Sequence, residues 1–230
     1  MSPGFDDFHC YVINLDRTPQ RMAVFLGQNA DAGLSFRRFA AVDGNAVSEE
    51  EALRLNIIKP GTTWQSRATI GVAMSHKTLW EKAVAEQRPL MIFEDDAYIR
   101  HDFRSRFTSL VAGMAAWDIV LLGYNTDSIV ELRVAGEFDF GGLFSIRAPT
   151  VPQLQKFVRV EDPVGLFRLR YAFGICAYAI TPAGAEKLLA RCFPMDNRLM
   201  VFKATGRQFN AYSIDCMMNV FYGELAAYAG

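Results

Sequence analysis

Short apolar runs alternate with segments of helical periodicity along this chain. The apolar runs predict strands at 9–15, 35–42, 90–94, 119–122 and 175–180. Apolar spacing and helix start signals predict helices at 19–32, 48–55, 69–87, 103–116, 181–189 and 213–221. Strands that alternate with helices are typical of an α/β fold, with a mainly parallel central sheet flanked by helices.

Several of the predicted helices have recognisable ends. Pro19 suits the first position of a helix, and Gly33 is a good stop. Ser48 and Glu51 have the spacing of a capping box, in which each side chain bonds to the backbone of the other residue. Thr181, which precedes a proline, predicts an N-cap for the helix that follows.

The stretch of residues 130–170 breaks this alternation. Glycines and prolines there separate short segments that contain phenylalanine. Because both residue types interrupt regular structure, we expect a hairpin and a long irregular excursion rather than a second domain. The prediction is a single domain over residues 1–230.

Composition restricts the classes of function. Of the 230 residues, 51% are hydrophobic and 21% are charged, as in ordinary soluble globular proteins, and the net charge is −1. Such a balance argues against nucleic-acid binding, which normally needs a basic surface. Four scattered cysteines without zinc-ligand spacing favour reduced thiols in a cytoplasmic protein. We expect no signal peptide and no membrane-spanning run, which leaves peripheral contact with a membrane open.

The most informative local feature is three adjacent carboxylates, Glu94, Asp95 and Asp96, directly after the apolar run of the third predicted strand. Because like charges repel one another, a cation is expected beside them. Carboxylate oxygens are hard ligands that suit Mg²⁺ or Mn²⁺. In an extended strand, Glu94 and Asp96 would point to one side and Asp95 to the other. The alternative is a solvated strand end with a helix-capping aspartate.

Other polar residues are expected at the same edge, because ligands of parallel α/β sheets bind beyond the carboxyl ends of the strands. The turn of residues 14–17 and the turn at Asp43 and Gly44 follow the first two predicted strands. Arg17 and Arg21 lie one helical turn apart, so both can receive a phosphate at a helix N-terminus. Two solvated arginines are the alternative.

One histidine lies near this group in sequence. His76 shares a predicted helix face with Ala73, Trp80 and Val84, so its ring is expected to face inward. An inward histidine is either a hydrogen-bonded core residue or a general base, and its place just before the acidic strand keeps both interpretations open.

In order along the chain, these segments resemble the conserved blocks of glycosyltransferase family 25, which includes bacterial lipooligosaccharide galactosyltransferases and domains of collagen galactosyltransferases. The matching blocks are YVINLDR at 11–17, FAAVDG at 39–44, GVAMSH at 71–76, FEDD at 93–96, GICAYAI at 174–180 and SID at 213–215. A single acidic triplet is a weak signal, whereas the ordered series is specific. The chain departs from the pattern at Ile175, where the family usually has threonine, and at Ser213, where it often has proline. Loss of the threonine hydroxyl bears on the choice of donor or acceptor.

The resemblance implies a GT-A fold and inverting transfer of a hexose, usually galactose, from a UDP-sugar to a saccharide acceptor such as a lipooligosaccharide core. It places Mn²⁺ or Mg²⁺ on the diphosphate, with Asp96 as the first ligand and Glu94 beside it. The residues expected to bind the donor are Asn14, Leu15, Arg17, Arg21, Asp43, Gly44, Ser75 and Asp95.

The resemblance also suggests the catalytic residues. An inverting transfer needs a general base at the acceptor hydroxyl, and Asp215 is the candidate, with His76 as a second catalytic candidate. Asp215 would otherwise cap the last helix or contact the donor. Asp196 is a substitute for the base, although Asp196 and Asn197 also suit a turn.

The excursion has a chemistry of its own. Three phenylalanines, Phe144, Phe157 and Phe167, are interleaved with charged residues. These are the basic Arg147, Lys156, Arg159, Arg168 and Arg170 and the acidic Glu161 and Asp162. One hypothesis is a lid or acceptor platform that touches an anionic glycolipid at a membrane surface. The alternative is a packed loop with buried phenylalanines.

Three rival functions use the same residues. A glucosyl- or N-acetylhexosaminyl-transferase would differ only in its donor sugar. A non-catalytic protein that binds nucleotide sugars or glycans could retain the fold. A metal-dependent phosphohydrolase would need a second acidic cluster or more histidines than the three present.

Overall fold

The structure is a computed structural model that describes residues 3–64, 66–163, 165–202 and 206–230. Its α-helices are α1 (Pro19–Gln28), α2 (Glu49–Arg54), α3 (Arg67–Glu86), α4 (Phe103–Ala112), α5 (Val151–Phe157), α6 (Pro182–Cys192) and α7 (Ile214–Phe221). Its strands are β1 (His9–Asn14), β2 (Phe36–Ala40), β3 (Leu90–Glu94), β4 (Ile119–Gly123), β5 (Val130–Ala135), β6 (Phe138–Gly142), β7 (Phe167–Tyr171), β8 (Ala177–Ile180), β9 (Leu199–Val201), β10 (Gln208–Asn210) and β11 (Ala227–Ala229). Short 3₁₀ helices are η1 (Phe5–Asp7), η2 (Ala30–Ala32) and η3 (Gly44–Ala46).

Nine strands form one sheet in the order β2-β1-β3-β8-β4-β11-β7-β5-β6, and β9 pairs with β10 separately. Strands β2, β1, β3, β4, β11 and β5 run in one direction, and β8, β7 and β6 run in the other. The predicted α/β class is confirmed. We predict a mainly parallel sheet, and six of the nine strands do run in one direction. Of the eight neighbouring pairs, however, only three are parallel, namely β2-β1, β1-β3 and β4-β11.

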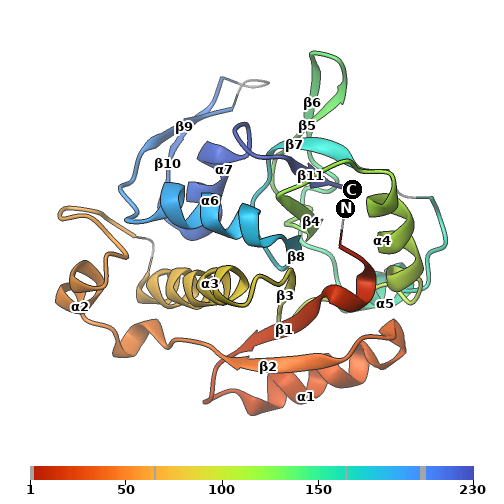
Figure 1. Cartoon of the computed structure of the whole chain (residues 1–230), viewed down its shortest axis with the longest axis horizontal. Helices are drawn as coiled ribbons and strands as arrows, with labels where there is room; N and C mark the ends of the chain where they lie inside the picture. Colours follow the sequence, from red (N-terminus) through yellow and green to blue (C-terminus); the bar gives the residue numbers. More distant parts are fainter. Residues whose placement is uncertain (1–2, 65, 164, 203–205) are drawn as a thin grey trace.

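Helices cover both faces of this sheet. On β3, Leu90 and Ile92 face a core built with α2, α3, α6 and α7, while Met91 and Phe93 face a second core built with α1 and α4. Figure 1 shows α3 beside α6, with α1 and α4 at other sides of the sheet. Because β3 is buried on both faces, its sequence is a continuous apolar run without polar alternation.

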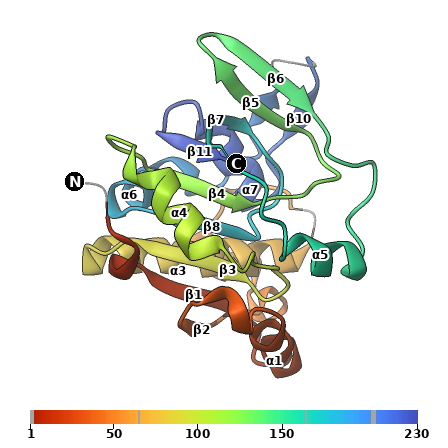
Figure 2. The same cartoon turned by 90° about the vertical axis from the view of Figure 1, so that its right-hand side faces the viewer.

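The predicted excursion is more regular than expected. Its hairpin is β5-β6, as predicted, but β5 and β7 also join the central sheet, and α5 lies between β6 and β7. Figure 2 shows the hairpin projecting beyond the sheet and the chain continuing along one edge of the molecule to α5. Val164, within this stretch, lies outside the described residues.

Two predicted helices end early. The first ends at Gln28 rather than at residue 32, because Asn29 caps the C-terminus of the helix. Its Nδ2 donates to the Phe25 carbonyl at 3.0 Å, and its Oδ1 accepts from the Ile99 N–H at 2.8 Å. The helix predicted to residue 116 ends at Ala112. The other predicted helices agree closely with α2, α3, α6 and α7, and Ser48 and Thr181 cap α2 and α6 as expected.

Among the described residues, none of the helices combines the length and the apolar character that crossing a bilayer requires. Cys10, Cys176, Cys192 and Cys216 are all free thiols.

Two glycines allow η3 to cross α3 at backbone contact. A Cβ at Gly44 would lie 1.9 Å from the Arg67 carbonyl oxygen, and a Cβ at Gly71 would lie 2.4 Å from the Val42 carbonyl oxygen. Neither neighbour is the end of a flexible side chain, so the crossing itself would have to open. The loop that carries Asp43 is therefore positioned by these two glycines.

We predict that Gly71→Ala lowers the free energy of unfolding by about 1–3 kcal/mol, because the added methyl group overpacks the crossing. Gly27→Ala is a matched control within α1, where a Cβ would meet nothing within 4 Å. There the change should raise stability by about 0.5–1 kcal/mol through helix propensity. Urea unfolding of both variants measures this. Equal stability of Gly71→Ala and the wild type would contradict the close crossing.

Candidate active site

The carboxyl ends of β1, β2 and β3 meet at one edge of the sheet, because β1 pairs in parallel with both neighbours. The buried Asn14 is the last residue of β1, and its side chain links β1 to the neighbouring chain segments at this edge. Its Nδ2 donates to Asp95 Oδ2 at 2.7 Å, and its Oδ1 accepts from Arg38 Nε at 2.9 Å. The predicted meeting of the first turn with the acidic triplet is thus confirmed as geometry.

Arg21 supplies positive charge to the triplet. Its Nε donates to Asp95 Oδ1 at 2.8 Å, its Nη2 donates to the same oxygen, and Nη2 also reaches Asp96 Oδ2 at 3.1 Å. These contacts raise the pKa of the guanidinium, chiefly through the hydrogen bond to Asp95. The cation that the triplet requires is therefore provided, in part, by the chain itself.

The three carboxylates do not alternate as a strand would place them. β3 ends at Glu94, and Asp95 and Asp96 form a turn, so the period of two stops one residue earlier than expected. Both aspartates consequently face the guanidinium of Arg21, which corrects the prediction that Asp95 points away from Asp96.

Glu94 is the last residue of β3 and is partly buried. Burial, followed by the charges of Asp96, Asp215 and Asp95, raises the pKa of its carboxyl to about 7. Arg21 opposes this shift. A carboxyl in this environment can hold or release a proton near neutral pH.

Asp215 approaches the same group from α7, since its charge acts on Glu94. Its Oδ2 accepts from the Gly174 N–H at 3.0 Å, and its Oδ1 accepts from Ser213 Oγ. Ser213 is the N-cap of α7, and Asp215 lies in the first turn, so Asp215 does not cap the helix itself. Its predicted role as general base stays a prediction.

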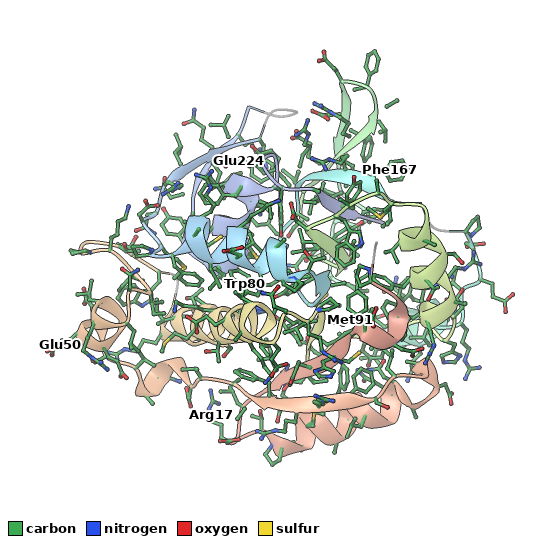
Figure 3. All side chains as sticks on the ribbon, in the orientation of Figure 1. Arg17, Glu50, Trp80, Met91, Phe167 and Glu224 are labelled. Carbon is green, nitrogen blue, oxygen red and sulfur yellow. The ribbon has the colours of Figure 1, made fainter. Side chains whose placement is uncertain are left out.

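The second predicted turn is tied to the first. Arg17 Nε donates to Asp43 Oδ2 at 2.8 Å, and this bond lowers the pKa of the Asp43 carboxyl. Figure 3 shows Arg17 at the outer edge of the molecule, beside β1. Gly44 follows in η3 and lies against α3 through its backbone. These residues form a rim at the sheet edge that also carries the triplet. Arg17 lies before α1, which begins at Pro19, so the prediction that Arg17 and Arg21 share the first turn of one helix is wrong.

Ser75 and Leu15 serve this rim through local bonds. The buried Ser75 Oγ accepts from the Val42 N–H at 2.9 Å and donates to the Gly71 carbonyl at 2.8 Å. The Leu15 carbonyl accepts from the Thr18 N–H at 3.0 Å. The hydroxyl of Ser75 thus holds the loop before Asp43 on α3, and direct contact of Ser75 or Leu15 with a donor stays a prediction.

His76 is fully buried, as its helix face predicts. Its Nδ1 lies 2.7 Å from Tyr178 Oη, and Trp80 Nε1 donates to the same oxygen at 2.8 Å. Within the described residues, no partner is found for His76 Nε2. Figure 3 shows Trp80 in the layer between α3 and α6. Because water does not reach the ring, this geometry favours a hydrogen-bonded core residue over a general base.

A cavity of about 1040 Å³ opens at the triplet. Of the predicted site residues, Arg21, Glu94, Asp95 and Asp96 line it, and the others do not. Its other walls include α1, the loop from the triplet to α4, α4 itself, the segment after β4 and the excursion. The predicted excursion and the predicted acidic site therefore share one cavity.

The segment after β4, residues 124–127, is a part of the site that our sequence analysis omitted. It lines the cavity, and the Asn125 N–H donates to the Phe173 carbonyl at 2.8 Å. A Cβ at Gly174, whose φ is +78°, would lie 2.4 Å from Asn125 Oδ1, so the glycine admits this close approach. The signal was available, because these polar residues directly follow an apolar strand that runs parallel to β3 in the sheet.

Asp96 is the residue best suited to a divalent cation. Its side chain is 62% exposed, and the contact with Arg21 leaves oxygen lone pairs open to the cavity. Among the described residues, no group of three or more His, Cys, Asp or Glu side chains surrounds one point. The site therefore does not fit an ion held by protein alone. It does fit Mg²⁺ or Mn²⁺ bound by one or two carboxylates together with water and substrate phosphates.

The fold and the site define an α/β protein whose ligand cavity lies at the carboxyl ends of its strands. A model of glycosyltransferase family 25 (LPS biosynthesis protein) matches residues 8–198. The chain belongs to glycosyltransferase family 25, as the sequence motifs indicate.

The relatives include proteins named as inactive family members and proteins named as transferases. The probable inactive glycosyltransferase 25 family member 3 of Rattus norvegicus is 29% identical over 215 residues, which cover 86% of this chain and 33% of the relative. Procollagen galactosyltransferase 2 of Homo sapiens is 23% identical over 215 residues, which cover 86% of this chain and 30% of the relative. The chain spans about a third of the length of these proteins.

The buried imidazole predicts a pH dependence of stability. Burial lowers the pKa of His76 to about 3, whereas its unfolded value is near 6.5. Between these values the unfolded chain binds a proton that the native chain does not, so stability falls as pH drops below about 6.5. Urea unfolding between about pH 6 and pH 4 gives the free energy of unfolding as a function of pH. The slope of this plot should be smaller in His76→Gln than in the wild type, by up to about 1.4 kcal/mol per pH unit. Identical slopes for wild type and variant would contradict the buried neutral ring.

Proposed function

We propose that this protein is an inverting, metal-dependent hexosyltransferase that moves a hexose, with galactose as the favoured sugar, from a UDP-sugar to a saccharide acceptor. The observation that carries the proposal is the acidic triplet after β3, which opens onto a large cavity with Arg21 beside it. Family membership supports sugar transfer, and the name of procollagen galactosyltransferase 2 supports galactose. The proposal includes the GT-A type of fold.

The residues at the cavity would divide the work of binding the donor. When bound at Asp96 and Glu94, Mn²⁺ or Mg²⁺ would neutralise the diphosphate that leaves. Arg21, at the first turn of α1, can exchange its contact with Asp96 for a phosphate oxygen. Asn14 holds Asp95 in place, so that Arg21 keeps one fixed partner while the other changes.

Asp215 is our candidate for the base that takes the proton from the acceptor hydroxyl. Its two oxygens are oriented by the Gly174 N–H and the Ser213 hydroxyl. Groups that donate hydrogen bonds to a carboxylate fix its orientation, which general-base catalysis requires. The acceptor that we propose is a saccharide or glycolipid of the lipooligosaccharide-core type, reached from the cytoplasm.

We predict that Asp96→Asn lowers kcat/KM for hexosyl transfer about 100- to 1000-fold, because the site loses a ligand of the cation that would neutralise the diphosphate. Asp31→Asn is the matched control, since the Asp31 side chain is 81% exposed and does not line the cavity. A coupled UDP-release assay with a panel of UDP-sugars measures the rates and identifies the donor. Full activity of Asp96→Asn would exclude this residue from the mechanism.

We predict that Asp215→Asn lowers kcat about 100- to 10,000-fold, as expected for loss of a general base. The split between kcat and KM separates this role from a structural one. The variant should keep the wild-type KM for the UDP-sugar, because only the proton transfer is lost, whereas a distorted site would raise this KM as well. A variant that turns over like the wild type would exclude Asp215 as the base.

Binding without turnover is the second candidate function. The observation that favours it is that relatives covering most of this chain are named inactive or probable inactive. In that case, the triplet would bind a nucleotide sugar or glycan without transfer. UDP binding with no UDP release on any acceptor would support this candidate over the enzyme.

A further inference from the structure

The segment from the end of β6 to the end of α5 exposes apolar side chains to water. Leu143, Phe144, Ile146, Val151 and Phe157 are all exposed, and Ile146 reaches 86% and Phe144 63%. The phenylalanines that the packed-loop interpretation places inside the protein are therefore outside. Large apolar side chains gathered in one short segment mark a contact surface rather than ordinary scatter. We refer to these five side chains as the apolar patch.

The same segment is basic. Residues 143–159 contain Arg147, Lys156 and Arg159 and no acidic residue, which gives a net charge of +3, and Glu161 and Asp162 follow this segment. Within the described residues, none of these three side chains is held in an ion pair. Their charge is therefore free to act on an external surface.

The segment lies at an edge of the molecule where a flat surface can reach it. Figure 2 shows the chain running from β6 along one side to α5, away from the central sheet. It is attached at a few points, which include the Ser145 N–H to the Thr126 carbonyl at 3.0 Å and the His101 N–H to the Val158 carbonyl at 2.9 Å. These bonds hold the ends of the segment while its side chains stay exposed.

The apolar patch also borders the cavity. Phe144, Val151 and Phe157 both belong to the patch and line the cavity that holds the acidic triplet. Ile146 and the three basic residues do not line it. A surface that contacts the patch therefore lies beside the cavity opening.

We propose that residues 143–159 dock this protein on an anionic lipid surface. Aromatic and aliphatic side chains enter the interface between headgroups and acyl chains, while neighbouring arginine and lysine side chains pair with lipid phosphates. Such a surface offers acyl chains to the exposed apolar groups and phosphates to the three basic side chains, for which no ion pair is described within the protein. A saccharide carried by a lipid would then be presented at the cavity, a consequence that rests on the proposed function.

The experiment is flotation of the purified chain with vesicles of phosphatidylcholine alone or mixed with phosphatidylglycerol. We expect binding to the mixed vesicles that weakens as salt is raised, and little binding to phosphatidylcholine alone. Ile146→Ser should weaken the partition coefficient about tenfold, because one large apolar side chain is lost from the interface. Arg147→Gln, Lys156→Gln and Arg159→Gln together should weaken it about a hundredfold.

Matched variants test whether the effect is local. Leu199→Ser removes an apolar side chain that is 54% exposed on β9, and Arg54→Gln removes an exposed charge on α2. Both should bind vesicles like the wild type. All four side chains in the single and triple variants are exposed, so the fold is expected to persist, and thermal unfolding checks this.

Three outcomes would overturn the proposal. One is a wild-type protein that stays in solution with anionic vesicles. Another is equal loss of binding in Leu199→Ser and Ile146→Ser. The third is self-association by sedimentation velocity that Ile146→Ser abolishes, without any vesicle binding, which would assign the patch to a second copy of the chain.

The test is independent of sugar transfer. Vesicle binding needs neither donor nor acceptor, so a failure of the proposed enzymatic function leaves this result intact. If transfer occurs, Ile146→Ser should reduce the rate on a lipid-linked saccharide in vesicles about tenfold and leave the rate on the soluble saccharide unchanged. If Ile146→Ser changed the rates on the two acceptors by the same factor, docking would not be linked to transfer.

Discussion

The hydrogen-bonded group of Asn14, Arg21 and Asp95 is the interaction on which the site depends. It joins the end of β1, the first turn of α1 and the turn after β3 at one point. Without these donors, three adjacent carboxylates at the edge of a core would repel one another. Charge-assisted bonds of this kind contribute about 1.5–3 kcal/mol each when shielded, and less here because the Arg21 side chain is half exposed.

This arrangement leaves the triplet divided into groups with different environments. Asp95 is committed to the protein, Asp96 is open to the cavity, and Glu94 is held where its pKa is near neutrality. Such a division is compatible with donor binding at Asp96 while the scaffold stays fixed. The apolar patch lies beside the same cavity, so the proposed donor site and the proposed docking surface share one part of the molecule.

Much of the fold follows from local sequence, and the exceptions have physical causes. β3 could be predicted because burial on both faces demands an unbroken apolar run, and α2 because Ser48 caps it. β11 could not, since Ala227–Ala229 is too short to show a period and gains its place from β4 and β7. At the site, the edge position of the triplet was predictable, whereas its neutralisation by Arg21 depends on a contact 74 residues distant in sequence.

The central claim is that a nucleotide diphosphate binds at the acidic triplet with a divalent cation. Calorimetry of UDP binding, with and without Mn²⁺, on the wild type and on Asp96→Asn tests it most directly. The account predicts binding that requires Mn²⁺ and is lost in the variant. UDP binding that ignores both the ion and the substitution would contradict it and remove Asp96 from the donor site.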